Sequence, residues 1–191
     1  TQVLIIGGAG MVGQKLCGHL LEHGLDGMVP KVALYDVSFA GPAPDAVIQM
    51  TGNLADPGEA VRIASLKADM IFHLAAIVSG DAEANFEKGW SINMMSMWHL
   101  LEALRSENAL DPAYVPKVIF TSSIAVFGAP YPEKIGDEFL QSPQTSYGAQ
   151  KACAELMLQD FSRKGFVDGV SLRLPTICVR PGKPNAAASS F

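Results

Sequence analysis

The feature that most constrains the fold is a glycine-rich turn near the start of the chain, Gly7-Gly8-Ala9-Gly10-Met11-Val12-Gly13. An apolar run of strand length, Val3–Ile6, precedes the turn. Val12, Leu16 and Leu20 follow at i, i+4 and i+8, the spacing of one helix face. The sequence therefore predicts a strand, a tight turn and a helix, the unit from which parallel sheets with crossover helices are built.

Strand-length apolar runs alternate with stretches of helical spacing along the rest of the chain. The expected strands are Val3–Ile6, Val32–Tyr35, Val47–Met50, Met70–Leu74, Lys117–Thr121 and Val170–Leu174. The expected helices are the one through Val12 and Leu20, with Gly24 just after its end, and those at Pro57–Leu66, about Glu83 to Arg105, and about Thr145 to Phe161. The expected long loops are Ser38–Pro44 and Gly128–Pro143. This alternation predicts an α/β fold with a doubly wound parallel sheet, the Rossmann fold, in one domain spanning residues 1–191.

Composition narrows the choice of partners and setting. The net charge is -5 without a basic cluster, and no apolar run reaches the ~20 residues of a membrane helix, so we expect neither nucleic acid nor membrane as a partner. Cys17, Cys153 and Cys178 lie far apart in apolar patterns, which suggests no disulfide framework, no metal site and a cytoplasmic setting. The absence of an initiator Met and the small polar run at the end suggest a longer natural protein, with a substrate-binding part largely missing here.

The glycine turn suggests a phosphate-binding role. Gly8, Gly10 and Gly13 fit G-x-G-x-x-G, and Gly7, Gly10 and Gly13 fit a related spacing. Side chains at such positions would block the tight turn or the approach of backbone to a pyrophosphate, and the helix N-terminus favours an anion. A tight turn without any ligand is the alternative.

Asp36 ends the second expected strand, where a carboxylate can accept hydrogen bonds from the adenosine ribose of a dinucleotide. It would repel a 2′-phosphate, and neither Val37 nor Ser38 supplies a compensating positive charge. The cofactor predicted is therefore NAD rather than NADP. Alternatively, Asp36 only caps a strand in a surface loop.

Tyr147 and Lys151 stand four residues apart near the start of an expected helix, so they share one face. A nearby ammonium and a positive nicotinamide would favour the phenolate, which could then take a hydroxyl proton while hydride leaves the carbon. Such a pair also occurs in ordinary amphipathic helices.

Ser123, at the end of the fifth expected strand, could orient the reacting oxygen. The neighbouring Thr121 and Ser122 read more simply as a loop entry that satisfies its own backbone.

Together these motifs resemble the extended short-chain dehydrogenase/reductase family, the NAD-dependent epimerases and dehydratases, from Val3 to about Asn185. The resemblance implies an enzyme with a catalytic Ser123, Tyr147 and Lys151. It implies cofactor contacts from Gly7, Gly10, Met11, Val12, Gly13, Asp36, Asn53, Leu54, Leu74, Ala75, Ala76, Asn93, Tyr147, Lys151, Pro175 and Ile177. Asn53 is an amide where the family more usually has Asp, and His73 reads as a buried strand-end residue. The resemblance also implies a homodimer through the Glu83–Arg105 and Thr145–Phe161 segments.

Three stretches resemble a narrower group in this family, dehydrogenases that oxidise the C2 hydroxyl of a D-erythronate-like sugar acid to a 2-oxo acid. They are 122–128, 145–151 and 172–185. The implied substrate is a small anionic polyol, bound by Ser123 and Tyr147. Arg180 is the candidate for its carboxylate and Ser79 for a hydroxyl, although Arg180 could equally pair with a surface acid.

Two other functions remain open. A nucleotide-sugar epimerase or dehydratase would keep the same cofactor and the same Tyr-Lys pair, because one scaffold serves many chemistries. A non-catalytic dinucleotide sensor would tend to lose Tyr147 or Lys151, and this chain retains both.

Overall fold

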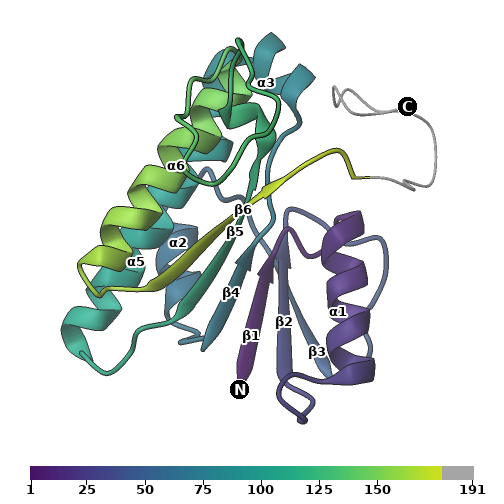
Figure 1. Cartoon of the computed structure of the whole chain (residues 1–191). Coiled ribbons are helices and arrows are strands. Elements are labelled where there is room, and N and C mark those ends of the chain that lie inside the picture. Colours follow the sequence, from purple (N-terminus) through teal and green to yellow (C-terminus); the bar gives the residue numbers. More distant parts are fainter. Residues whose placement is uncertain (178–191) are drawn as a thin grey trace.

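The computed structural model describes residues 1–177, in which six strands form one parallel sheet (Figure 1). The strands are β1 (Gln2–Ile6), β2 (Lys31–Asp36), β3 (Val47–Thr51), β4 (Met70–His73), β5 (Lys117–Ser123) and β6 (Asp168–Leu174). Their order in the sheet is β3-β2-β1-β4-β5-β6, which is the doubly wound Rossmann order with its reversal point between β1 and β4. All six expected strands are confirmed: five extend by one or two flanking residues, and β4 ends at His73, one residue before its expected end.

The helices between these strands supply the crossovers. They are α1 (Met11–His23), α2 (Pro57–Ala64), α3 (Ser79–Ala84), α4 (Phe86–Trp90), the π-helical turn η1 (Ser91–Met95), α5 (Ser96–Leu110), the 3-10 turn η2 (Ile124–Val126) and α6 (Ser146–Arg163). Gly24 follows α1 with a φ of 73°, as expected of a residue just past a helix end.

The expectation of one helix from Glu83 to Arg105 is wrong. Asn85 has φ -125° and ψ 74°, outside the helical region, so the chain bends there and begins a second helix. The break follows the end of α3, where the Asn85 amide donates to the Asp81 carbonyl oxygen and its Nδ2 donates to the Asp81 carboxylate at 2.7 Å. The last helix of the series then runs beyond Arg105 to Leu110.

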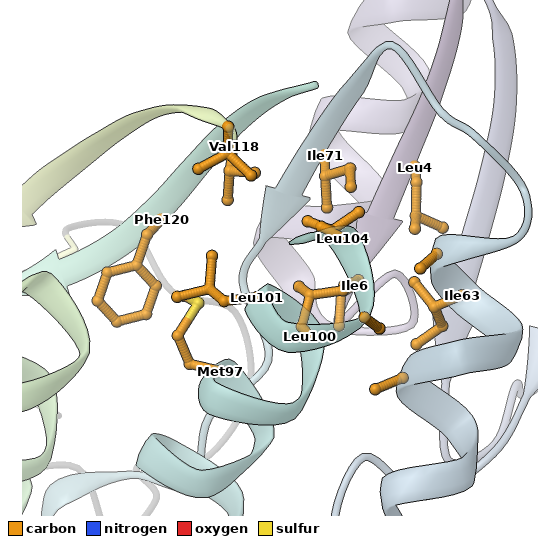
Figure 2. Packing of buried hydrophobic residues seen from close by; sticks show 14 of the residues in the cluster. Leu4, Ile6, Ile63, Ile71, Met97, Leu100, Leu101, Leu104, Val118 and Phe120 are labelled. Atoms are coloured by element: carbon orange, nitrogen blue, oxygen red, sulfur yellow. The ribbon is translucent and has the colours of Figure 1, made fainter. Parts of the chain in front are cut away.

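Helices cover both faces of the sheet, with α1 on one face and α2, α5 and α6 on the other (Figure 1). Side chains of β1 alternate between the two faces: Val3 and Ile5 pack with α1, whereas Leu4 and Ile6 pack with α2 and α5. Figure 2 shows the second layer, where side chains of the strands meet those of α2 and α5. The labelled residues are Leu4, Ile6, Ile63, Ile71, Met97, Leu100, Leu101, Leu104, Val118 and Phe120.

The packing of this buried layer holds the strands in place, and it thereby sets the positions of the strand ends. Because all strands are parallel, their carboxyl ends lie at one edge, where the loops carrying polar side chains gather. Within residues 1–177, no helix combines the length and the apolar character needed to cross a bilayer.

Candidate functional site

A cavity of about 540 Å³ opens at the carboxyl ends of β4, β5 and β6. It brings together many of the residues predicted from sequence, namely Val12, Leu74, Ala76, Ser79, Ser123, Tyr147, Lys151, Pro175 and Ile177. These residues come from separate segments of the chain, and the sheet order places them at one point.

The glycine turn follows β1, and of its residues Val12 lines the cavity whereas the glycines do not. Gly7 has a φ of 88°, which favours glycine, and a Cβ on Gly13 would lie 2.4 Å from the carbonyl oxygen of Gly7. Larger residues at either position would force the turn open. Gly10 is the N-cap of α1 and offers no side-chain cap to the first turn of the helix. The turn and helix start therefore form a close-packed backbone surface suited to an anionic group.

Asp36 lies beside this turn at the end of β2. Its Oδ2 accepts a hydrogen bond from the Ala9 amide at 2.9 Å, and its Oδ1 accepts one from the Val37 amide at 2.7 Å. The carboxylate thus ties the end of β2 to the glycine turn, and each oxygen keeps capacity for a further hydrogen bond.

Other predicted cofactor contacts lie outside the cavity lining. Asn53 accepts a hydrogen bond from the Ala55 amide through Oδ1, and Leu54 is buried in the core. Ala75 donates its amide to the Ile6 carbonyl. Asn93 is fully buried and bonds to the backbone of Ile77. The remaining predicted residue of the glycine turn, Met11, is the first residue of α1.

Tyr147 lies in the first turn of α6, where Thr145 caps the helix by accepting a hydrogen bond from the Gly148 amide. One turn further on, Lys151 is 1% exposed and its Nζ donates to the Thr121 carbonyl oxygen at 2.7 Å. The same nitrogen lies 5.6 Å from the centre of the Tyr147 ring. The predicted pair therefore shares one helix face, and β5 fixes the position of the amine.

Burial changes the acidity of both groups. It lowers the pKa of Lys151 to about 7, and the carboxylate of Glu155 opposes this effect. Burial also raises the pKa of the Tyr147 phenol above its usual value. With these shifts alone, the Tyr147 phenol is protonated at neutral pH, while Lys151 gains or loses its proton near pH 7.

Ser123 is the last residue of β5 and the N-cap of η2, with its Oγ accepting a hydrogen bond from the Ala125 amide at 3.1 Å. The start of α6 packs tightly on this segment, since a Cβ on Gly148 would lie 2.1 Å from the Ala125 carbonyl oxygen. Glycine at 148 thus allows the helix that carries Tyr147 to approach the turn that carries Ser123. Both side chains line the same cavity.

Several residues of the site were not foreseen. Thr121 anchors Lys151 through its carbonyl oxygen, and Thr145, Phe127 and Tyr131 line the cavity. The capping position of Thr145 before an apolar helix could have indicated its role. The contacts of Thr121, Phe127 and Tyr131 depend on tertiary structure, which leaves no local signal.

A partly buried ion pair lies one turn beyond Lys151 on α6. Glu155, one turn further along α6, accepts hydrogen bonds from Arg173 of β6, the shortest at 2.8 Å. Arg173 also donates to the Asp137 carbonyl oxygen, and Gln141 donates to Glu155 at 2.5 Å. The pair therefore joins α6, β6 and the loop that follows η2.

His73 is completely buried at the end of β4. Burial lowers its pKa to about 3, and the charge of Lys151 acts in the same direction. The imidazole is therefore neutral at physiological pH, in line with a structural role.

In residues 1–177 no group of three or more His, Cys, Asp or Glu side chains is placed to hold a metal ion.

Ser79, the first residue of α3, lines the cavity as predicted for a substrate contact. Arg180, the predicted carboxylate-binding residue, lies outside the described residues.

Comparison with known proteins identifies the class. Residues 3–189 match the model of the NAD dependent epimerase/dehydratase family, so the chain belongs to that family.

Two curated relatives carry the same name. The chain is 47% identical over 196 aligned residues to the D-erythronate dehydrogenase of Cupriavidus necator, covering 99% of this chain and 59% of the relative. It is 43% identical to the D-erythronate dehydrogenase of Haemophilus influenzae, covering all of this chain and 59% of the relative. The chain thus spans about three fifths of the length of these relatives.

A solved structure carries a different name. The chain matches the crystal structure of the nucleoside-diphosphate-sugar epimerase from Agrobacterium tumefaciens with a TM-score of 0.92 and 53% identity. The match covers 98% of this chain and 56% of that structure. The names of similar proteins therefore point to two chemistries on one scaffold.

Proposed function

We propose that this protein is an NAD-dependent dehydrogenase that oxidises the C2 hydroxyl of a small, D-erythronate-like sugar acid to the 2-oxo acid. The observation that carries the proposal is the gathering of Tyr147, Lys151 and Ser123 around one cavity at the carboxyl ends of the strands. Hydroxyl oxidation needs a proton acceptor, a charge that favours its ionised form and a group that orients the substrate oxygen.

The residues at the glycine turn fit a dinucleotide. The turn is packed too tightly for a side chain at Gly13, and α1 begins at Gly10 without a side-chain cap. These backbone groups would hold the pyrophosphate, and Asp36 would accept hydrogen bonds from the adenosine ribose. When bound, NAD supplies the acceptor for the hydride that leaves the C2 carbon.

The chain's own residues would manage the proton. Tyr147, as phenolate, accepts the hydroxyl proton as the C–H bond breaks and the carbonyl forms. Lys151 stabilises the phenolate by its charge, and the Thr121 carbonyl oxygen keeps the amine in place. Ser123 holds the reacting oxygen in line with the phenol. Glu155 keeps Lys151 charged over a wider pH range, since its carboxylate raises the pKa of the amine.

The choice of substrate rests on the relatives. Both curated relatives are named D-erythronate dehydrogenase, and each aligns with nearly the whole chain. We infer that the substrate is a small sugar acid, with Ser79 contacting a hydroxyl and Arg180 contacting the carboxylate.

An epimerase acting on a nucleotide sugar is the second candidate. The name of the Agrobacterium tumefaciens structure and its 53% identity favour it. Such an enzyme would use the same Tyr147 and Lys151 but would return the hydride to the substrate, so no net NADH would accumulate.

Absorbance of reduced nicotinamide separates the candidates. Purified protein is mixed with NAD and either a panel of four-carbon sugar acids or UDP-sugars, with the Cupriavidus necator relative as the positive control. We expect the absorbance to grow with D-erythronate alone. Interconversion of UDP-sugars without net NADH would instead establish the epimerase, and no reaction with either panel would remove the proposal.

We further propose that the chain forms a homodimer through α5 and α6 and their neighbours. Apolar side chains on these elements remain exposed, among them Met95, Trp98 and Leu156. Sedimentation equilibrium should give twice the monomer mass, and Leu156→Glu should reduce it to the monomer. A monomer at micromolar concentration would contradict the proposal.

A further inference from the structure

Gln150 is a buried polar residue beside the catalytic candidates, and the proposed reaction assigns it no part. It lies immediately before Lys151 in α6 and is completely buried. Its Oε1 accepts a hydrogen bond from Nδ2 of Asn93 at 2.8 Å, whereas its Nε2 has no hydrogen-bond partner within residues 1–177. A buried amide is costly unless it is hydrogen-bonded, so the bond to Asn93 is what orients the side chain.

Asn93 is hydrogen-bonded in turn to the backbone beside the cavity. Its Oδ1 accepts from the Ile77 amide at 2.9 Å, and its Nδ2 also donates to the Ile77 carbonyl oxygen at 3.2 Å. Ile77 lines the cavity just after Leu74 and Ala76. The three residues therefore form an amide clamp, defined here as Gln150, Asn93 and Ile77, between α6 and the segment that leaves β4.

Local backbone geometry places Asn93 within this clamp. The turn Ser91–Met95 is π-helical, and such turns shift the side chains that follow around the helix axis. Within this turn Asn93 is buried, while its neighbours Ile92 and Met94 are only partly buried.

Gly89 supports the clamp from the opposite side. A Cβ built on Gly89 would lie 2.5 Å from Nε2 of Gln150, and its other two nearest atoms also belong to the Gln150 amide. Glycine in α4 thus leaves space that the Gln150 side chain fills. Gly89 and Gln150 are distant in sequence but pack directly against each other, although neither lines the cavity.

We propose that Gln150 is a positioning residue for hydride transfer, because the amide clamp holds the helix of Tyr147 and Lys151 in register with the segment after β4 that lines the cavity. The inference rests on the proposed dehydrogenase function. Gln150 does not line the cavity, so it would act through the clamp and not by contact with substrate or cofactor. Its loss should therefore slow the reaction more than it weakens cofactor binding.

The test compares Gln150→Ala, Gly89→Ala and the double variant with the wild type. In each protein kcat, the Kd for NADH and the hydrogen exchange of the Ile77 amide are measured. Both single variants should lower kcat by roughly 10- to 100-fold, the size expected for a misplaced reacting group, with the Kd within about twofold. Ile77 should exchange faster in both, because its acceptor on Asn93 is less firmly held.

The double variant distinguishes positioning from general damage. Removing the Gln150 amide frees the space that the added methyl group of Gly89→Ala needs, so the double variant should be no slower than Gln150→Ala. Independent, additive losses would overturn the proposal. Gly18→Ala is the matched control, since a Cβ there meets no atom within 4 Å, and it should leave kcat unchanged.

Gln150→Met serves as a second variant that keeps the core filled while removing the hydrogen bond. It should repeat the fall in kcat with an unchanged melting temperature. Normal kcat in Gln150→Met, or a fall in kcat matched by an equal rise in Kd, would reject the positioning role. If the wild type reduces no NAD, the proposed dehydrogenase function is rejected. Hydrogen exchange of the Ile77 amide in the variants then still tests whether Gln150 holds the clamp together.

Discussion

The amine nitrogen of Lys151 lies 5.6 Å from the centre of the Tyr147 ring and is held there by a hydrogen bond to the Thr121 carbonyl oxygen. The amine is fully buried, and its distance from the ring lets its charge act on the phenol through a medium of low polarity. Because burial lowers the pKa of Lys151 to about 7, this charge can be gained or lost near neutral pH. The pair therefore responds to pH and to any change in the segments that hold it.

Burial of Lys151 should lower the free energy of unfolding by an amount that depends on pH. Its pKa is about 7 in the folded state and 10.5 when unperturbed, so the unfolded chain binds more protons between these values. The cost is therefore complete below pH 7 and disappears as the pH rises toward 10.5. Lys151→Met should unfold at higher urea concentration than the wild type at about pH 7, and the difference should shrink at about pH 9. A difference that does not depend on pH would contradict the assignment.

Glu155→Gln should move the acid limb of the kcat profile to higher pH. The carboxylate of Glu155 raises the pKa of Lys151, so its removal leaves less ammonium at neutral pH and less support for the Tyr147 phenolate. Steady-state rates measured from about pH 6 to about pH 10 provide the test. Asp160→Asn is the control, because Asp160 pairs with Arg163 on an exposed part of the same helix. An equal shift in both variants would show that Glu155 has no specific effect.

Gly148→Ala should separate Tyr147 from Ser123. The added Cβ would lie 2.1 Å from the Ala125 carbonyl oxygen, so the start of α6 must move away from η2. We expect a loss of about 1–3 kcal/mol in the free energy of unfolding and a fall in kcat. Gly18→Ala, in open space on α1, should not lower stability. Unchanged kcat in Gly148→Ala would mean that the packing of α6 against η2 does not position the site.

Asp36→Ala should weaken the preference for NAD over NADP. The variant removes the acceptor for the ribose hydroxyls and the charge that repels a 2′-phosphate, and it also frees the Ala9 amide. We expect kcat/KM for NAD to fall by on the order of 10-fold, as for loss of a hydrogen bond to a charged group. The ratio of kcat/KM for the two cofactors gives the result, with Asp45→Ala in an exposed loop as the control. An unchanged ratio would place the ribose acid elsewhere.

The sequence predicted those features of the fold that depend on a local pattern of residues. Hydrophobic periodicity predicted all six strands, and the glycine spacing predicted the turn before α1. Parallel strands put Ser123 and Tyr147 at the same sheet edge, so their shared cavity followed from the topology.

Features that depend on tertiary contacts were not predicted. The π-helical turn around Asn93 is joined to α6 by the hydrogen bond between Asn93 and Gln150, which hydrophobic spacing does not reveal. The partner of Lys151 is a backbone carbonyl, which any residue at position 121 could supply. The pair of Glu155 and Arg173 joins residues on different elements. Such contacts become visible only when the fold is known.

The most direct test of the account is the Tyr147→Phe variant, measured for both turnover and NADH binding. The substitution removes the proton acceptor and leaves the glycine turn intact, so turnover with a four-carbon sugar acid should fall by at least about 100-fold. The Kd for NADH should stay within about twofold of the wild type. Turnover close to that of the wild type would contradict the assignment of Tyr147 as the base, and with it the proposed mechanism.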